Sequence, residues 1–226
     1  MIYFENVSKI YNKDLVALDN INLTIKAGEF ISIVGHSGAG KSTLLKMILA
    51  DDKPTMGTVF FDSTDIHKLN NGNLTKMRRK IGTVFQDCKL FSNKTAYENI
   101  SCAMEAVCKT DEEINSDVPH ILKLVDLSDR IFHFPSQMSG GEQQRLAIAR
   151  AIVNQPEVII ADEPTENLDP ISAREIIQIF KKINELGSTI ILTTHNKSLI
   201  DMIGKRVITL EKGKIIKDDQ NGKYML

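Results

Sequence analysis

Short runs of apolar residues alternate with amphipathic stretches along most of the chain. The run at residues 30–34 is almost wholly apolar and ends at Gly35, which is typical of a strand buried on both faces of a parallel sheet. Runs of similar length predict further strands at 2–7, 21–25, 58–61, 158–161 and 189–193. Helical patterns follow at 41–50, 141–153 and 172–186. The alternation of strands and helices indicates an α/β protein.

Two segments depart from this alternation. Between about residues 88 and 138 the apolar positions follow helical spacing and strand-like runs are few, which indicates a helical insertion. Near the end of the chain, residues 207–211 and 214–217 flank Lys212 and Gly213 in the pattern of a β-hairpin. Because no internal repeat or flexible linker is visible, we expect these parts to belong to one domain.

The composition is that of an ordinary globular domain and argues against two environments. Of the 226 residues, 42% are apolar and 25% are charged, and the formal net charge is -1. Because Lys and Arg are scattered, we expect no DNA or RNA partner. No apolar run reaches the length of a membrane helix, and residues 1–9 lack a signal-peptide core. We therefore expect a cytoplasmic chain, unless another protein holds it at a membrane.

The segment after the buried strand at 30–34 fits the phosphate-binding pattern G-x-x-x-x-G-K-[ST]. It reads Gly35, His36, Ser37, Gly38, Ala39, Gly40, Lys41 and Ser42, and Thr43 follows it. Glycines let the backbone fold closely around phosphates, and the helix that begins near Lys41 adds the positive end of its dipole. In this pattern Lys41 reaches the β and γ phosphates and Ser42 binds Mg²⁺. The strand before the segment and the helix after it support a MgATP site.

Two adjacent carboxylates follow another apolar run. Asp162 and Glu163 come after residues 158–161, at the edge where parallel sheets place their ligands. Asp162 would hold Mg²⁺, directly or through water, and Glu163 would polarise the water that attacks the γ phosphate. An Asp-Glu pair after a strand also occurs in ordinary capped turns. Beside a phosphate-binding loop, we interpret the pair as catalytic.

A second set of backbone donors precedes the helix predicted at 141–153. The segment reads Ser139, Gly140, Gly141, Glu142 and Gln143. A helix N-terminus of this kind presents N–H groups to an anion. The alternative interpretation is a simple helix cap with Ser139 as the N-cap residue. That alternative does not explain why two glycines stand together.

These motifs and several single positions together resemble the nucleotide-binding domains of ATP-binding cassette (ABC) transporters. The positions that carry the resemblance are Tyr11, residues 35–42, Gln86 in Val84-Phe85-Gln86-Asp87, residues 139–143, Asp162-Glu163, Asn167-Leu168-Asp169 and His195. The resemblance covers nearly the whole chain. It implies a P-loop NTPase (RecA-like) core with an N-terminal antiparallel β-subdomain and an inserted α-helical subdomain.

The resemblance also implies how the domain is divided. Residues 1–226 would form a single ABC ATPase domain. Its core and β-subdomain would comprise about 1–87 and 157–226, and its helical subdomain about 88–156.

Several roles in ATP hydrolysis follow from the resemblance, residue by residue. Tyr11 matches the aromatic residue that stacks on adenine. Gln86 matches the Q-loop glutamine, which contacts Mg²⁺ or the attacking water. His195 matches the switch histidine, which contacts the γ phosphate. ATP and Mg²⁺ are therefore the expected ligands, and Glu163, His195 and Lys41 are the expected catalytic residues.

The resemblance further implies a homodimer that forms on ATP binding. Residues Ser139, Gly140, Gly141, Glu142 and Gln143 match the family's signature, which binds the γ phosphate of ATP held by the opposite subunit. Asp169, in the loop after the catalytic acid, would lie at the dimer interface and couple the two sites. The active site would then be complete only in the dimer.

Within the superfamily the chain resembles most the cell-division group, in which the ATPase works with an FtsX-type integral membrane partner. His36 in the P-loop is the most telling position, and Arg78-Arg79-Lys80-Ile81-Gly82, Tyr97-Glu98-Asn99-Ile100 and Phe134-Pro135 are further similarities. A helix of the membrane partner would dock near Gln86 and residues 88–91. The ATPase would lie on the inner face of the membrane and would control peptidoglycan hydrolases indirectly.

Two positions depart from the family pattern, and two other functions stay open. Met138 stands where the family usually has Leu, and Glu166 where close relatives usually have Gly. Glu166 adds a negative charge near the expected γ-phosphate site and bears on rate and dimer affinity. The alternatives are an ATPase of a macrolide or lipoprotein exporter and a nucleotide-responsive division scaffold with little turnover. The carboxylate of Glu163 argues against the scaffold, because a pure binder needs no base.

Overall fold

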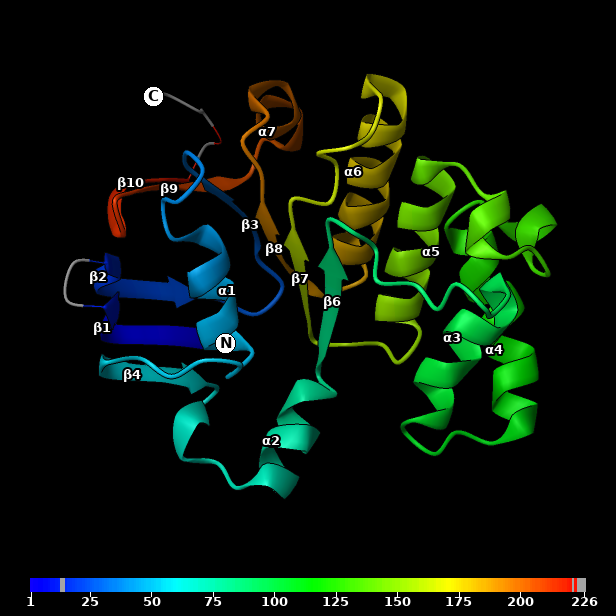
Figure 1. Cartoon of the computed structure of the whole chain (residues 1–226), viewed down its shortest axis with the longest axis horizontal. Helices are drawn as coiled ribbons and strands as arrows, with labels where there is room; N and C mark the ends of the chain where they lie inside the picture. The colour runs from blue at the N-terminus through cyan, green and yellow to red at the C-terminus, as the bar shows by residue number, and fades with distance from the viewer. Residues whose placement is uncertain (13–14, 221, 223–226) are drawn as a thin grey trace.

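The structure is a computed structural model in which residues 1–12, 15–220 and 222 are described. Within these residues the strands form two sheets that lie on either side of α1 (Lys41–Ile48) (Figure 1). One sheet has six strands in the order β10-β9-β3-β8-β7-β6, and the other has four in the order β2-β1-β4-β5. None of the helices in the described part of the chain is long and apolar enough to cross a membrane.

The six-stranded sheet carries the core of the fold. Its strands are β3 (Phe30–Val34), β6 (Ile81–Phe85), β7 (Val158–Asp162), β8 (Thr189–Thr193), β9 (Arg206–Glu211) and β10 (Lys214–Asp219). All neighbouring strands are parallel except β9 and β10, which form the predicted antiparallel hairpin. Every residue of β3 is buried, which confirms the prediction of a strand covered on both faces.

The period of two along a strand explains how this sheet separates the two larger hydrophobic cores. In β7, Val158 and Ile160 pack into the core around α1, whereas Ile159 and Ala161 pack into the core on the opposite face. Helices on both faces are what a parallel sheet needs, because neither face can be left to water.

The four-stranded sheet is antiparallel and consists of β1 (Ile2–Asn12), β2 (Leu15–Ile25), β4 (Met56–Phe61) and β5 (Thr64–Asp65). The first two strands are longer than the predicted runs at 2–7 and 21–25. Their pairing shifts register several times, and Asn6 and Asn20 have positive φ. Such irregularities interrupt the alternation of apolar and polar residues, so the sequence pattern captured only part of each strand.

Helices cover the second face of the parallel sheet and extend to one side of it (Figure 1). They are α3 (Ala96–Glu105), α4 (Asp111–Leu124), α5 (Gly140–Ile152), α6 (Pro170–Glu185) and α7 (Lys197–Ile203). Short 3₁₀ helices lie at Ile66–Lys68, Ser128–Arg130 and Pro135–Gln137. The structure confirms the helical character of residues 88–138 and the helices predicted at 141–153 and 172–186 to within two residues at each end.

Besides the two-residue strand β5 and the 3₁₀ helices, three elements were not predicted from the sequence. Helix α2 (Asn71–Arg78) is largely polar and buries only Met77, so it has no apolar stripe to detect. Strand β6 is short and contains Gly82, which is unusual in a strand interior. Helix α7 has seven residues, and its N-cap Asn196 accepts hydrogen bonds from the N–H groups of Ser198 and Leu199.

Arg206, the first residue of β9, joins the two sheets. Its guanidinium donates to both carboxylate oxygens of Asp218, at 2.7 and 2.6 Å, and to Glu29 at 2.9 Å. It also donates to the carbonyl of Thr24 in β2 at 2.8 Å. The side chain is only 10% exposed, so these bonds replace water that the charge has lost.

Replacing Arg206 with Met should lower the free energy of unfolding by about 2–4 kcal/mol, because the Glu29 carboxylate then loses its partner while largely buried. Urea unfolding of both proteins measures the change. Lys214→Met is the matched control. It breaks a surface ion pair with Asp19 in which the lysine is 63% exposed, so its effect should stay within about 0.5 kcal/mol. Equal losses in both variants would contradict a special role for Arg206.

Candidate functional site

Four of the residues predicted to act on ATP follow four neighbouring strands of the parallel sheet. Gly35 follows β3, Gln86 follows β6, Glu163 follows β7 and His195 comes two residues after β8. Because the strands are parallel, all four positions lie at one edge of the sheet. This is the edge at which open α/β sheets bind their ligands.

The loop between β3 and α1 needs glycine at two positions. Gly40 has φ 106°, and a Cβ atom there would lie 2.5 Å from the carbonyl oxygen of Ala17. A Cβ atom on Gly35 would lie 2.3 Å from the carbonyl oxygen of Leu210. Gly40 is also the N-cap of α1 and offers no side-chain acceptor to the first turn. The N–H groups of that turn are therefore arranged to receive an anion.

Lys41, Glu163 and His195 are in direct contact. The ammonium of Lys41 donates to the carbonyl of Gly35 at 2.8 Å and lies 3.4 Å from a carboxylate oxygen of Glu163. The other oxygen of Glu163 lies 3.2 Å from Nδ1 of His195. Lys41 and Glu163 are largely buried, whereas the His195 side chain is 55% exposed. The structure thus brings together the three residues predicted to be catalytic.

Thr193 positions both carboxylates and was missed in the sequence. Its hydroxyl donates to Asp162 at 2.6 Å and accepts from the backbone N–H of Glu163 at 2.9 Å. The side chain is completely buried. A threonine at the end of a strand, opposite an Asp-Glu pair, is a detectable signal, but only once the pairing of β7 with β8 is known.

A cavity of about 700 Å³ lies over this edge of the sheet, within the usual size range of small-molecule sites. The predicted ATP-site residues that line it are Tyr11, His36, Ser37, Gly38, Ala39, Gly40, Lys41, Ser42, Thr43, Gln86, Glu163 and His195. Leu15, Val16 and Ala17 of β2 line it as well and were not predicted, and so does Glu166. Gly35 and Asp162 are not among the lining residues, and the Asp162 carboxylate is bonded to the Thr193 hydroxyl.

Tyr11 lines the same cavity, and 42% of its surface is exposed. The ammonium of Lys9 lies 4.8 Å from the centre of the Tyr11 ring. Lys9 is itself held by Asp52 at 2.5 Å and by the carbonyl of Lys53 at 2.8 Å. A ring supported by a cation in this way is a suitable platform for a nucleotide base.

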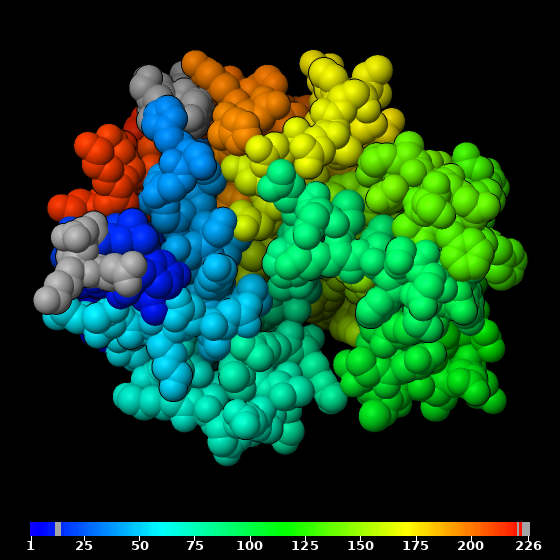
Figure 2. Space-filling view, in the orientation of Figure 1, coloured from blue at the N-terminus to red at the C-terminus, as the bar shows by residue number. Residues whose placement is uncertain are grey.

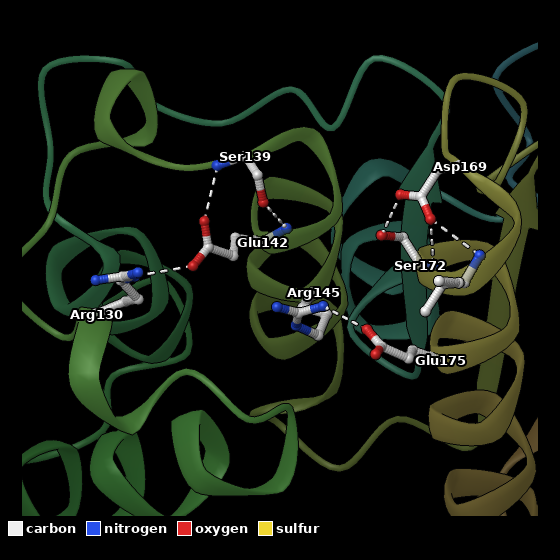
Figure 3. Close-up of polar contacts among 8 residues, drawn as sticks. Arg130, Ser139, Glu142, Arg145, Asp169, Ser172 and Glu175 are labelled. Atoms are coloured by element: carbon white, nitrogen blue, oxygen red, sulfur yellow. Dashed lines mark hydrogen bonds and ion pairs between the residues drawn. The ribbon is translucent and has the colours of Figure 1, made fainter.

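The second motif, residues 139–143, forms the start of α5 and does not line this cavity. Ser139 and Glu142 form a capping box, in which each side chain accepts a hydrogen bond from the other residue's backbone N–H. The second carboxylate oxygen of Glu142 accepts from Arg130 at 2.8 Å (Figure 3). Gln143 donates to the carbonyls of Pro135 and Met138. The capping role of Ser139, considered as an alternative, is therefore present in the fold.

These contacts lower the pKa of the Glu142 carboxyl from 4.5 to about 2, mainly through the hydrogen bond from Arg130 and then the backbone N–H of Ser139. A lowered pKa means that the pair stabilises the fold above about pH 4.5 and stops doing so as the pH falls towards 2. The difference in unfolding free energy between the wild type and Arg130→Gln should thus shrink from about pH 7 to about pH 3. Urea titrations at both values measure it, and a constant difference would contradict the ion pair.

Asp169 lies close to this motif, at the start of α6. It caps that helix by accepting hydrogen bonds from the N–H groups of Ile171 and Ser172 and from the Ser172 hydroxyl at 2.5 Å. Hydrogen bonds from Ser172 lower the pKa of the Asp169 carboxyl. A Cβ atom on Gly141 would lie 3.0 Å from the Ser172 hydroxyl oxygen. The two helix N-termini are therefore in contact (Figure 3).

The residues present fit a Mg²⁺ ion that is bound together with ATP. The predicted donors, the Ser42 hydroxyl, the Gln86 amide and the Asp162 carboxylate, are the oxygen ligands that Mg²⁺ prefers. The described residues include no group of three or more His, Cys, Asp or Glu side chains placed to hold a metal ion. Phosphate oxygens would therefore have to complete the coordination, as is usual for this ion.

Comparison with known proteins found a matching family model and several relatives. A sequence model described as ABC transporter matches residues 18–166. The chain is 44% identical over 224 residues to the cell division ATP-binding protein FtsE of Bacillus subtilis, covering 99% of this chain and 98% of that protein. It is 42% identical to the methionine import ATP-binding protein MetN 1 of Oceanobacillus iheyensis, covering 99% of this chain but 66% of that protein.

A solved structure shares the fold. The ATP-binding cassette MJ0796, in a dimeric post-hydrolysis state bound to ADP and Pi, superimposes with a TM-score of 0.87. It is 40% identical to this chain, and the match covers 97% of this chain and 98% of that one. The predicted P-loop core with its antiparallel sheet and inserted helices is confirmed by this likeness and by the two sheets described above.

Proposed function

The chain belongs to the ABC transporter family of ATPases, and from this premise we propose that it is the ATP-hydrolysing subunit of an FtsE/FtsX-type complex. In this complex, ATP-driven dimerisation would act on a membrane partner that controls peptidoglycan hydrolysis during bacterial cell division. The full-length likeness to a cell-division ATP-binding protein supports the proposal. No nucleic acid takes part in it.

The geometry at the sheet edge supports a hydrolytic mechanism. ATP would place its base on Tyr11 and its phosphates over residues 36–43, which line the same cavity. The ammonium of Lys41 lies 3.4 Å from Glu163 in this structure. It would bind the γ phosphate in place of Glu163 when ATP is present. Released from that contact, Glu163 would accept a proton from the attacking water, while His195 would hold the carboxylate and contact the phosphate. When bound, Mg²⁺ would neutralise part of the phosphate charge.

The observation that carries the dimer proposal is the position of the signature. Residues 139–143 are absent from the lining of the chain's own cavity, although their N–H groups and paired glycines suit a phosphate. A head-to-tail dimer would bring the signature of one subunit to the cavity of the other. Asp169, next to the signature at the start of α6, would then lie at the interface and connect the two sites.

The membrane partner would bind beside the Q-loop, the segment after β6 that carries Gln86. Leu90 packs partly against the helical core, whereas Phe91 is 48% exposed. Phe91 borders a cavity of about 440 Å³ between the end of α2 and α3, where the surface in Figure 2 is hollowed. We place a cytoplasmic helix of the FtsX-type partner there. This contact would hold the ATPase at the inner face of the membrane.

The family likeness leaves methionine import as a second candidate, because MetN proteins are about as similar in this region. Purified protein can be reconstituted with an FtsX-type partner, or with a methionine permease, from the same genome. We expect turnover per chain to rise with protein concentration, and to be stimulated by the FtsX-type partner alone. Stimulation by the permease alone would assign the chain to methionine import. Turnover per chain that does not change with protein concentration would reject the dimeric site.

A further inference from the structure

The Q-loop has a strained backbone. Cys88 has φ 55° and Lys89 has φ 46°, which is the left-handed region that residues other than glycine rarely adopt. Such conformations persist only where surrounding contacts hold them in place. The contacts that do so come from α5, the helix that begins with the signature.

Arg150, in the last turn of α5, holds the two strained residues directly. One terminal nitrogen of its guanidinium donates to the carbonyl of Lys89 at 2.8 Å, and the other donates to the carbonyl of Cys88 at 2.9 Å. The guanidinium also lies 5.7 Å from the centre of the Phe91 ring. Burial lowers the pKa of this guanidinium, so its charge has been moved out of water to make these bonds.

Gln144, six residues earlier on α5, forms hydrogen bonds with the start of the same loop. Only 2% of this residue is exposed. Its side-chain oxygen accepts from the Cys88 thiol at 2.7 Å, and its side-chain nitrogen donates to the carbonyl of Phe85 at 3.4 Å. Gln86 lies between Phe85 and Cys88, the two residues that Gln144 contacts. The loop that carries it is therefore bonded to α5 on both sides.

We propose that Arg150, assisted by Gln144, is a positioning residue that fixes Gln86 at the ATP cavity and makes the Q-loop move with the signature helix. Both residues lie on the helix whose first turn is the signature, so any shift of α5 displaces the Q-loop backbone. The inference rests on the proposed function, because it assigns Arg150 a part in the hydrolysis for which Gln86 is expected to be needed.

The position of Arg150 determines which kinetic parameter it affects. It touches no residue of the P-loop and does not line the ATP cavity. Loss of the two hydrogen bonds from Arg150 to the Q-loop should therefore leave ATP binding intact and misplace Gln86 during the chemical step. We expect Arg150→Gln to lower kcat about ten-fold, with the KM for ATP changed by less than about two-fold.

The thiol of Cys88 reports on the loop independently of turnover. Burial, with the nearby Asp87 carboxylate, raises the pKa of this thiol to about 11, so its alkylation by iodoacetamide is slow while the loop is held. In a Cys102→Ser, Cys108→Ser background, Cys88 is the only cysteine of the chain. The Arg150 guanidinium partly lowers the pKa of the Cys88 thiol, so its loss would by itself slow alkylation. Arg150→Gln should nevertheless raise the alkylation rate of Cys88 about ten-fold, because the loop opens more often.

Arg78→Gln is the matched control. Arg78 also donates to two backbone carbonyls, those of Leu49 and Ala50, but it is exposed and lines neither the ATP cavity nor the 440 Å³ cavity. It should change neither kcat nor the alkylation rate. Arg150→Lys retains the charge but not the planar fork, and should give intermediate values of both. If Arg150→Gln does not fold, the Lys variant carries the comparison.

The two readouts separate the possible failures. An unchanged alkylation rate in Arg150→Gln would overturn the proposal that Arg150 holds the Q-loop in place, whether or not the wild type hydrolyses ATP. Faster alkylation with an unchanged kcat would overturn the positioning role. Absence of turnover in the wild type would instead reject the proposed function, and the alkylation rates would still decide whether α5 holds the loop.

Discussion

Replacing Glu163 with Gln is expected to lower ATP turnover by about 10²–10⁴-fold, which is the usual contribution of a general base. Gln has nearly the same shape as Glu, but its amide does not accept a proton from water. ATP binding should persist, because the variant also removes a negative charge next to Lys41, 3.4 Å away. Bound ATP should then accumulate in a long-lived dimer, which size-exclusion chromatography with ATP would detect.

Glu166→Gln provides the control for this substitution. Glu166 lines the same cavity three residues further on but is exposed, and the chemical step needs only one base. Its turnover should remain within about three-fold of the wild type. Equal turnover of the wild type and Glu163→Gln would remove Glu163 from the chemistry and favour a scaffold with little turnover.

Replacing Lys41 with Ala is expected to weaken ATP binding by about 100-fold or more. The ammonium is a charge-assisted donor in a largely buried site, and each such bond to phosphate contributes about 1.5–3 kcal/mol. The variant also leaves the Glu163 carboxylate without its cation, so it repels the γ phosphate. Turnover and ATP-driven dimerisation should disappear together. Fluorescent nucleotide titration measures the affinity.

Lys46→Ala is the matched control, because Lys46 lies on the same helix and points into solvent. We expect an affinity within about two-fold of the wild type. A comparable loss in both variants would mean that α1 contributes only a general positive field. Unchanged binding in Lys41→Ala would reject the P-loop as the site of the phosphates.

The sequence was sufficient for elements whose apolar pattern is regular. β3 and β8 are buried along their whole length, and α6 has a continuous apolar stripe, so their ends could be predicted closely. In β1 the shifts of register hide the second half of the strand. Helix α2 was missed because its stabilising contacts, such as that of Arg78 with the carbonyl of Leu49, are polar and distant in sequence.

In the candidate site, too, only the residues that belong to a local sequence pattern could be predicted. Residues that belong to contiguous motifs, such as Lys41 and Glu163, could be located from spacing alone. Thr193 acts on Asp162, which is 31 positions away, and Arg150 acts on Cys88, which is 62 positions away. Nothing in the local pattern reveals such partners, because strand order and helix packing bring them together. Tertiary structure was needed to find residues that support the motifs.

The central claim is that the signature of one subunit completes the ATP site of the other, and mixing two inactive variants tests it most directly. Lys41→Ala removes the phosphate-binding cation, and Ser139→Arg blocks the signature. In a mixed dimer, one site combines the intact P-loop of one chain with the intact signature of the other. Each mixed dimer keeps one intact site of two, so a mixture of equal amounts should restore about a quarter to a half of wild-type turnover. A mixture as inactive as its components would contradict the shared site.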